Sequence, residues 1–149
     1  MPRTSSMLLS MALLLGVGGV AHGDGPWQDP VTLDGLVGSY ARAAIGPGDG
    51  EIVYVTFGGS DGYRAAGPYT RFIEAARGGV ALERGRYQAI GDNPAIGPII
   101  NFADERGLSR DNYFILGIER DPLGKEIIAL ELLKGGGDGQ PIVLHRVGW

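Results

Sequence analysis

The strongest pattern for chemistry in this chain is Gly58-Gly59-Ser60-Asp61-Gly62. It matches the turn that presents the serine nucleophile of many hydrolases. Asp121 or Asp138, followed by His145, would supply the acid and the base in the hydrolase order. Such a turn needs a following helix that raises the hydroxyl and helps to form an oxyanion hole, and the residues after it predict none. We therefore interpret the pattern as hairpin-turn chemistry and expect no catalytic residue here.

The other polar candidates are weaker. His145 is the only histidine after residue 22, and one histidine cannot build a multi-histidine metal site. The pairs Asp104-Glu105 and Asp111 with Glu119 could bind calcium or act as a glycosidase acid and base. They lack the required loop spacing with a glycine hinge, so we interpret them as solvated turns. We expect neither a metal nor another cofactor.

Composition narrows the classes of partner. The chain has no cysteine, so disulfides and thiolate zinc sites are excluded and a hydrophobic core must hold the fold. The formal net charge is −4, and the basic residues are scattered rather than clustered. Nucleic acids and anionic membranes are bound through clustered Lys and Arg. We therefore expect no nucleic-acid partner and no stable membrane insertion, and oligomeric state is left open.

The amino terminus has the pattern of a secretory signal peptide. Arg3 precedes the apolar run Met7–Val20, and Ala21-His22-Gly23 provides small residues at the cleavage positions. The run is shorter than the about 20 residues that a spanning helix needs. We predict cleavage before Asp24 and a secreted or periplasmic protein. Without a cysteine the mature chain cannot carry an amino-terminal lipid.

Short runs of β-forming residues, separated by glycine-rich turns, fill the rest of the chain. After an irregular lead-in (24–35), a single domain (36–149) contains candidate strands at residues 36–43, 51–57, 63–66, 80–90, 96–103, 112–120, 126–133 and 141–146. Residues 68–79 carry apolar residues at helical spacing, but they lie between two strands with little chain to spare. We favour an extended hairpin there over a short helix.

The predicted fold is an all-β, antiparallel eight-stranded up-and-down barrel, with a β-sandwich as the alternative. Closure removes the exposed sheet edges, and the interior of such a barrel is filled by side chains or holds one small ligand. Alternation places Phe114, Leu116 and Ile118 on one face of their strand. It likewise groups Ile128, Leu130 and Leu132 on one face of the next strand.

The pattern resembles the small secreted barrels of the lipocalin and calycin type. The likeness rests on the strand opener Gly38-Ser39-Tyr40, the eight-strand meander and the late Arg146. Members of that group open with glycine, any residue and tryptophan, and a late arginine packs across that ring at the closed end. Here tyrosine replaces the tryptophan, although Gly25-Pro26-Trp27 matches the letters. The first and last strands of an up-and-down barrel are neighbours, and alternation places Arg146 on the same face as Ile142 and Leu144. We therefore predict that Arg146 stacks on Tyr40, or on Trp27 if the lead-in folds back, and that Arg146→Ala destabilises by about 1–3 kcal/mol.

The aromatic inventory suggests a ligand. We predict a secreted non-enzymatic barrel that binds a small apolar molecule in or near its interior. The residues expected to line the site are Tyr40, Tyr54, Phe57, Tyr87, Phe102, Phe114, Leu116 and Leu130. Two alternatives stay open. One is a protein-binding or inhibitor module that acts through glycine-rich hairpins such as 135–139, and the other is a small barrel enzyme resembling allene oxide cyclase or dirigent proteins.

Overall fold

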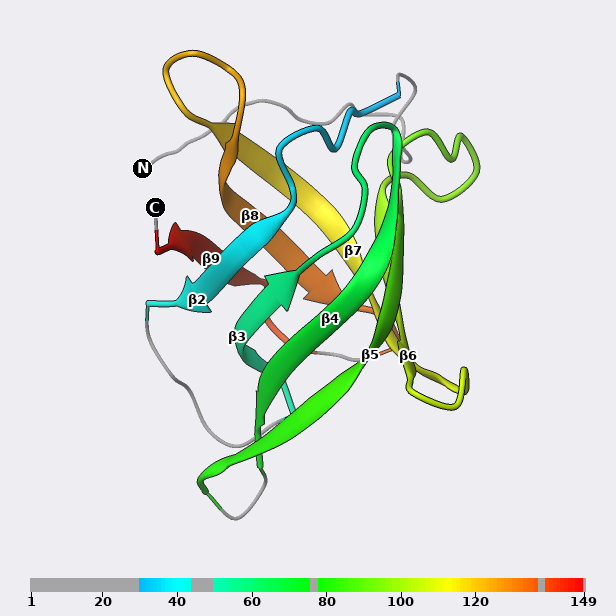
Figure 1. Ribbon diagram of the computed structural model, residues 1–149, viewed down its shortest axis with the longest axis vertical. Helices are drawn as coiled ribbons and strands as arrows, with labels where there is room; N and C mark the ends of the chain where they lie inside the picture. The colour runs from blue at the N-terminus through cyan, green and yellow to red at the C-terminus, as the bar shows by residue number, and fades with distance from the viewer. Residues whose placement is uncertain (1–29, 44–49, 76–77, 137–138, 149) are drawn as a thin grey trace.

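Eight antiparallel strands close into one barrel in chain order, as the computed structural model shows (Figure 1). It describes residues 30–43, 50–75, 78–136 and 139–148. The strands are β2 (Gly38–Arg42), β3 (Ile52–Phe57), β4 (Arg64–Glu74), β5 (Val80–Ile90), β6 (Ile99–Asp104), β7 (Ser109–Arg120), β8 (Ile127–Lys134) and β9 (Ile142–Val147). The up-and-down barrel predicted from the sequence is confirmed. The signal peptide expected at residues 1–23 lies outside the described residues.

The pairing of the first and last strands closes the barrel. Tyr40 of β2 lies opposite Arg146 of β9, and β2 also pairs with β3. Residues 68–74 are extended, as we expected, because they belong to β4, which continues to Glu74 and pairs with β5 along its whole length. The described part of the chain contains no helix of the length and apolarity that crossing a membrane requires.

Strand direction gives the barrel two distinct ends. The starts of β2, β4, β6 and β8 meet the ends of β3, β5, β7 and β9 at one end, which we call the closed end. The described lead-in (30–37) runs over this end, at the top of Figure 1. It is fixed by backbone hydrogen bonds from Val31 to Gly91 and from Leu33 to Gly62. Leu33 and Leu36 of this segment are fully buried.

Aromatic rings fill the middle of the barrel. Phe57 contacts Tyr40 and Tyr87 edge to face, with ring centroids 5.9 and 4.8 Å apart. It also stacks against Phe102 at 6.1 Å, and Phe102 meets Tyr69 at 4.8 Å. These separations lie within the range of direct aromatic contact. This part of the interior is therefore a packed core.

The facing predicted for β7 is wrong over its first half. Tyr113 and Ile115 are buried in the core, whereas Phe114 is only half-buried and Leu116 lies on the surface. The pairing with β8 shifts at Leu116, so this residue is a bulge. A bulge adds one residue to a strand and reverses the alternation beyond it. Ile118 consequently packs against the core, although regular alternation would place it on the same face as Phe114 and Leu116.

A second shift corrects the facing of β8. Ile127 is fully buried, whereas Ile128 is only partly so, because Arg120 pairs with Ile127 and Glu119 with Ala129. Ile128 is the extra residue between these pairs. Leu130 and Leu132 face the core, as the alternation predicted.

Gly38 explains why this strand opens with glycine. Its φ is +143°, in the region that favours glycine, and a Cβ there would collide with the guanidinium of Arg146. The glycine of the Gly38-Ser39-Tyr40 opener thus makes room for the arginine opposite. Its function is to let the closed end pack.

The buried tyrosines predict a loss of stability at high pH. Burial raises the pKa of Tyr87 to about 12, and its hydroxyl donates to the Gly58 carbonyl at 2.7 Å. Burial also raises the pKa values of Tyr40, Tyr69 and Tyr113. Because the unfolded value is about 10, stability is complete below pH 10 and falls as the pH rises towards 12. Urea unfolding at stepped pH, followed by circular dichroism, should show this decline, and an unchanged midpoint through pH 12 would contradict it.

Candidate functional site

Arg146 locks the closed end. Its guanidinium carbon lies 4.9 Å from the centre of the Tyr40 ring, and Nη2 donates to the Tyr40 hydroxyl at 2.8 Å. Nε donates to the Ile127 carbonyl at 2.7 Å and Nη1 to the Val37 carbonyl at 3.1 Å, with a further bond to Gly35. The contact between Arg146 and Tyr40 expected from the sequence is therefore present. The other expected partner, Trp27, lies outside the described residues.

The lead-in is held by further side chains around this lock. The Tyr40 hydroxyl donates to the Leu36 carbonyl at 2.6 Å. Arg120 of β7 donates to the carbonyls of Thr32 and Asp34 at 2.8 and 2.7 Å. Guanidinium groups matched to backbone carbonyls satisfy acceptors that would otherwise be buried without a partner. The contacts at the closed end therefore attach the lead-in to the barrel.

The opposite end of the barrel contains buried charge. Arg71 of β4 is 1% exposed, and its guanidinium carbon lies 4.2 Å from the centre of the Phe102 ring. Nη2 forms an ion pair with Asp111 of β7 at 2.8 Å, and a second ion pair joins Arg71 to Glu83 of β5. Burial opposes the charge on Arg71, but the two carboxylates outweigh it, so the pKa is raised. The guanidinium therefore remains charged inside the barrel.

Two tyrosines and another carboxylate adjoin this ion cluster. Tyr69 lies under the Arg71 guanidinium at 5.4 Å from the ring centre. Tyr113 is fully buried, and its pKa is raised first by burial and then by the carboxylates of Asp111 and Glu51. Glu51 is itself 4% exposed, at the residue before β3. Several polar groups thus share this end of the interior.

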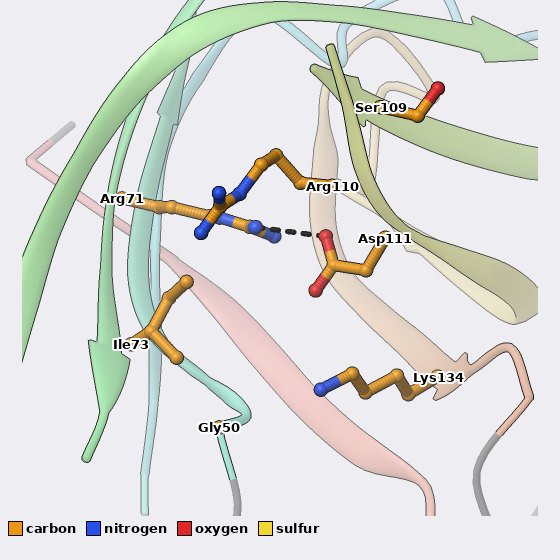
Figure 2. A pocket seen from close by; sticks show the side chains of 7 residues that line it. All are labelled: Gly50, Arg71, Ile73, Ser109, Arg110, Asp111 and Lys134. Atoms are coloured by element: carbon orange, nitrogen blue, oxygen red, sulfur yellow. Dashed lines mark hydrogen bonds and ion pairs between the residues drawn. The ribbon is translucent and has the colours of Figure 1, made fainter. Parts of the chain in front are cut away.

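A pocket of about 330 Å³ opens beside the cluster. Its lining residues are Gly50, Arg71, Ile73, Ser109, Arg110, Asp111 and Lys134. In Figure 2, Arg71 and Asp111 point toward one another from β4 and β7. Lys134 reaches toward the same space from the end of β8. The pocket is therefore polar on most sides, with Ile73 as its main apolar contact.

The positively charged side chains of the pocket differ in whether a carboxylate pairs with them. Arg110 forms an ion pair with Glu83 at 2.7 Å while its side chain stays 53% exposed. Within the described ranges, Lys134 has no hydrogen bond or ion pair, although it is partly buried. A methyl group added at Gly50 would lie 3.3 Å from the Lys134 ammonium. Glycine there, with φ at +82°, keeps the space before the ammonium open.

The residues predicted to line a ligand site do not form one surface. Five of them are buried in the packed core: Tyr40, Phe57, Tyr87, Phe102 and Leu130. Phe114 and Leu116 lie outside it, as described above. Tyr54 is also outside, where its ring contacts that of Phe72 at 6.1 Å. The core residues share the interior with the pocket cluster, but none of the eight lines the pocket.

Sequence reasoning missed Arg71 and Lys134. It named Asp111 but interpreted it as part of a solvated turn, which is wrong, because Asp111 lies within β7 and forms an ion pair with the buried Arg71. The alternation along β4 was a usable signal, because Tyr69 and Arg71 are two residues apart and therefore point to the same, inward face of the strand. An arginine at an inward strand position requires a carboxylate or an aromatic partner. That signal identifies a buried arginine but not the strands that supply its partners.

Ser60 and His145 lie on different parts of the barrel. Ser60 belongs to the turn between β3 and β4, and its hydroxyl is 3.5 Å from the Ala66 carbonyl. His145 is exposed on the outer face of β9, opposite Ala41 and Ala129. The carboxylate of Asp121 accepts the Lys125 amide in a turn, and Asp138 lies outside the described residues. These positions do not assemble a catalytic triad, and the described residues include no cluster of three metal-ligating side chains.

Comparison of the chain with models of protein families, with curated proteins and with solved structures finds no match.

Proposed function

We propose that this protein is an exported, non-enzymatic β-barrel that binds a small molecule in the pocket beside Arg71. The observation that carries the proposal is this pocket of about 330 Å³, one wall of which is a buried, ion-paired arginine. Ligand sites are usually concave, largely preformed and about 300–1,000 Å³ in volume. The secretory pattern in residues 1–23 supports export.

The packing of the core supports the pocket as the binding place. The rings of Phe57, Tyr87 and Phe102 contact one another where a ligand enclosed by the barrel would lie. The pocket instead offers hydroxyl, guanidinium and ammonium groups around Ile73. We therefore expect a ligand with a polar group rather than the purely apolar ligand that the aromatic inventory suggested. The likeness to lipocalin-type barrels supports ligand binding in general, because such barrels can hold one small molecule.

Amide chemical-shift mapping on the full chain tests the binding place. Small carboxylic acids, amines and neutral compounds are added, and compounds that bind should shift the amide signals of Gly50, Ser109 and Lys134. Ser109→Trp fills the pocket and should weaken binding at least about tenfold, because an indole would occupy the ligand volume. Ser60→Trp, in the turn at the closed end, is the matched control and should leave affinity unchanged.

Three outcomes would contradict the proposal. The first is that none of the compounds binds at the pocket. The second is that the shifts collect at the closed end or among the core rings. The third is that Ser60→Trp weakens binding as much as Ser109→Trp while both variants stay folded.

One observation favours a second function, a small barrel enzyme. Arg71, Asp111 and Tyr113 place a polar cluster inside the barrel, next to the pocket. Such a cluster could steer a reactive intermediate with few catalytic groups, as proteins of the allene oxide cyclase or dirigent type are expected to do. The proton NMR spectrum of the ligand, recovered after the mapping experiment, separates the two functions. A binding protein returns the ligand unchanged, whereas an enzyme converts it to a product. The protein-binding alternative stays a prediction, because residues 137–138 of its hairpin lie outside the described part.

A further inference from the structure

The charges that line the pocket are unequal. Three cationic side chains, Arg71, Arg110 and Lys134, face it, against the single carboxylate of Asp111. Asp111 is already engaged, because Arg71 lies 2.8 Å from its Oδ1. Glu83 forms ion pairs with both Arg71 and Arg110, and it does not line the pocket. Glu51 is buried near Tyr113 and does not line the pocket either. Among the residues that line the pocket, positive charge therefore exceeds negative charge.

Lys134 is the cation best placed to bind a ligand. The other described cations pair with carboxylates or carbonyls, or are exposed at the surface. Lys134 is partly buried, and it has no hydrogen bond or ion pair with any residue that the structure describes. A partly desolvated ammonium has lost water contacts that an anion can replace. Gly50 keeps the approach to this ammonium free.

Arg110 provides the neighbouring donors. The Arg110 side chain is 53% exposed and shares Glu83 with Arg71, so it can turn toward a ligand while Glu83 keeps one cation. Ser109 lines the same wall at its edge. A cationic ligand would instead face like charges at short range. A neutral ligand would leave Lys134 unpaired.

We infer that the pocket binds the anionic oxygen group of a small molecule, a carboxylate or a phosphate, between Lys134 and Arg110. The inference rests on the proposed function and adds the chemical class of the ligand. Arg71 contributes from behind as a fixed positive charge, held by Glu83 and Asp111. Ile73 offers apolar contact to the remainder of the molecule.

Three benzene derivatives of similar size, together with inorganic phosphate, test this inference by chemical-shift titration of the full chain. Benzoate and inorganic phosphate represent the two sources of anionic oxygen, and benzamide and benzylammonium are the neutral and cationic counterparts. Benzoate or phosphate should bind at the Gly50, Ser109 and Lys134 amides about ten- to hundredfold more tightly than benzamide, the range expected for a charge-assisted hydrogen bond. The affinity should fall as ionic strength rises.

Lysine substitutions supply the decisive comparison. The chain has two lysines, Lys134 in the pocket and the exposed Lys125 in the turn between β7 and β8. Lys134→Met should weaken anion binding about tenfold or more, whereas Lys125→Met should leave it unchanged. Both changes remove one positive charge, so a difference cannot come from net charge alone.

The outcomes separate the two proposals. If benzamide or benzylammonium binds at the pocket as tightly as the anions, the small-molecule site stands and the anionic class is overturned. If Lys134→Met and Lys125→Met weaken anion binding equally, the assignment to Lys134 is overturned. If no probe binds at the pocket, the anion inference fails, and a binder found there in the broader mapping mixture would preserve the proposed function. Thermal melting confirms that each variant is folded.

Discussion

Arg71→Met is expected to lower the free energy of unfolding by about 3–5 kcal/mol, as is usual when one partner of a buried ion pair is removed. The change leaves the carboxylates of Glu83 and Asp111 without the cation that holds them together. Methionine retains contact with the Phe102 ring, so the loss reports mainly on charge. Urea unfolding, followed by circular dichroism, measures the effect.

Two controls define the origin of this loss. Replacing Asp111 by asparagine in the Arg71→Met background removes the carboxylate that loses its ion pair, whereas Glu83 keeps its ion pair with Arg110, so most of the stability should be recovered. Arg64→Met breaks an ion pair with Asp92 whose arginine is 67% exposed, and it should cost less than about 1 kcal/mol. A similar cost for Arg64→Met and Arg71→Met would show that the buried cluster has no special weight.

Arg146→Ala is expected to destabilise the protein by about 3 kcal/mol, at the upper end of the range predicted from the sequence. The guanidinium satisfies carbonyls of the lead-in and of Ile127 while it covers the Tyr40 ring. Its removal leaves those acceptors buried without their donor and opens a void beside the ring. Hydrogen exchange should also show faster exchange for the amides of Val31 and Leu33, because the lead-in loses part of its attachment.

The matched control for this prediction is Arg86→Ala. Arg86 is exposed on the outer face of β5 and should contribute less than about 0.5 kcal/mol. Arg146→Lys keeps the charge but lacks the planar fork, so an intermediate loss is expected. If Arg146→Lys equals the wild type, charge alone accounts for the closure. If Arg146→Ala equals Arg86→Ala, the lock at the closed end does not contribute to stability.

Local sequence signals determined the architecture of this protein. Alternating apolar residues and glycine-rich turns specify strands and hairpins through short-range preferences, and eight such strands favour closure. The extended course of β4 followed from its place between two strands. The pairing of Tyr40 with Arg146 followed from the neighbouring positions of the first and last strands in an up-and-down barrel.

The facing of β7 and β8 was beyond the reach of the sequence pattern. Leu116 and Ile128 read as regular members of an alternating run, yet each is an extra residue in the pairing of these strands. A bulge depends on how two strands match in length and register, which the sequence of one strand does not contain. Phe114 was therefore expected inside, and Tyr113 took that place.

The candidate site was decided by tertiary structure. Arg71, Glu83, Asp111 and Lys134 stand on four strands, and each alone is an ordinary charged residue near a strand end. Closure of the barrel brings the first three into ion pairs and places Lys134 beside them, with no partner among the residues that the structure describes. The sequence by itself determined which residues form strands, because that choice is local. Which charges meet depends on contacts between distant strands that only the closed barrel makes.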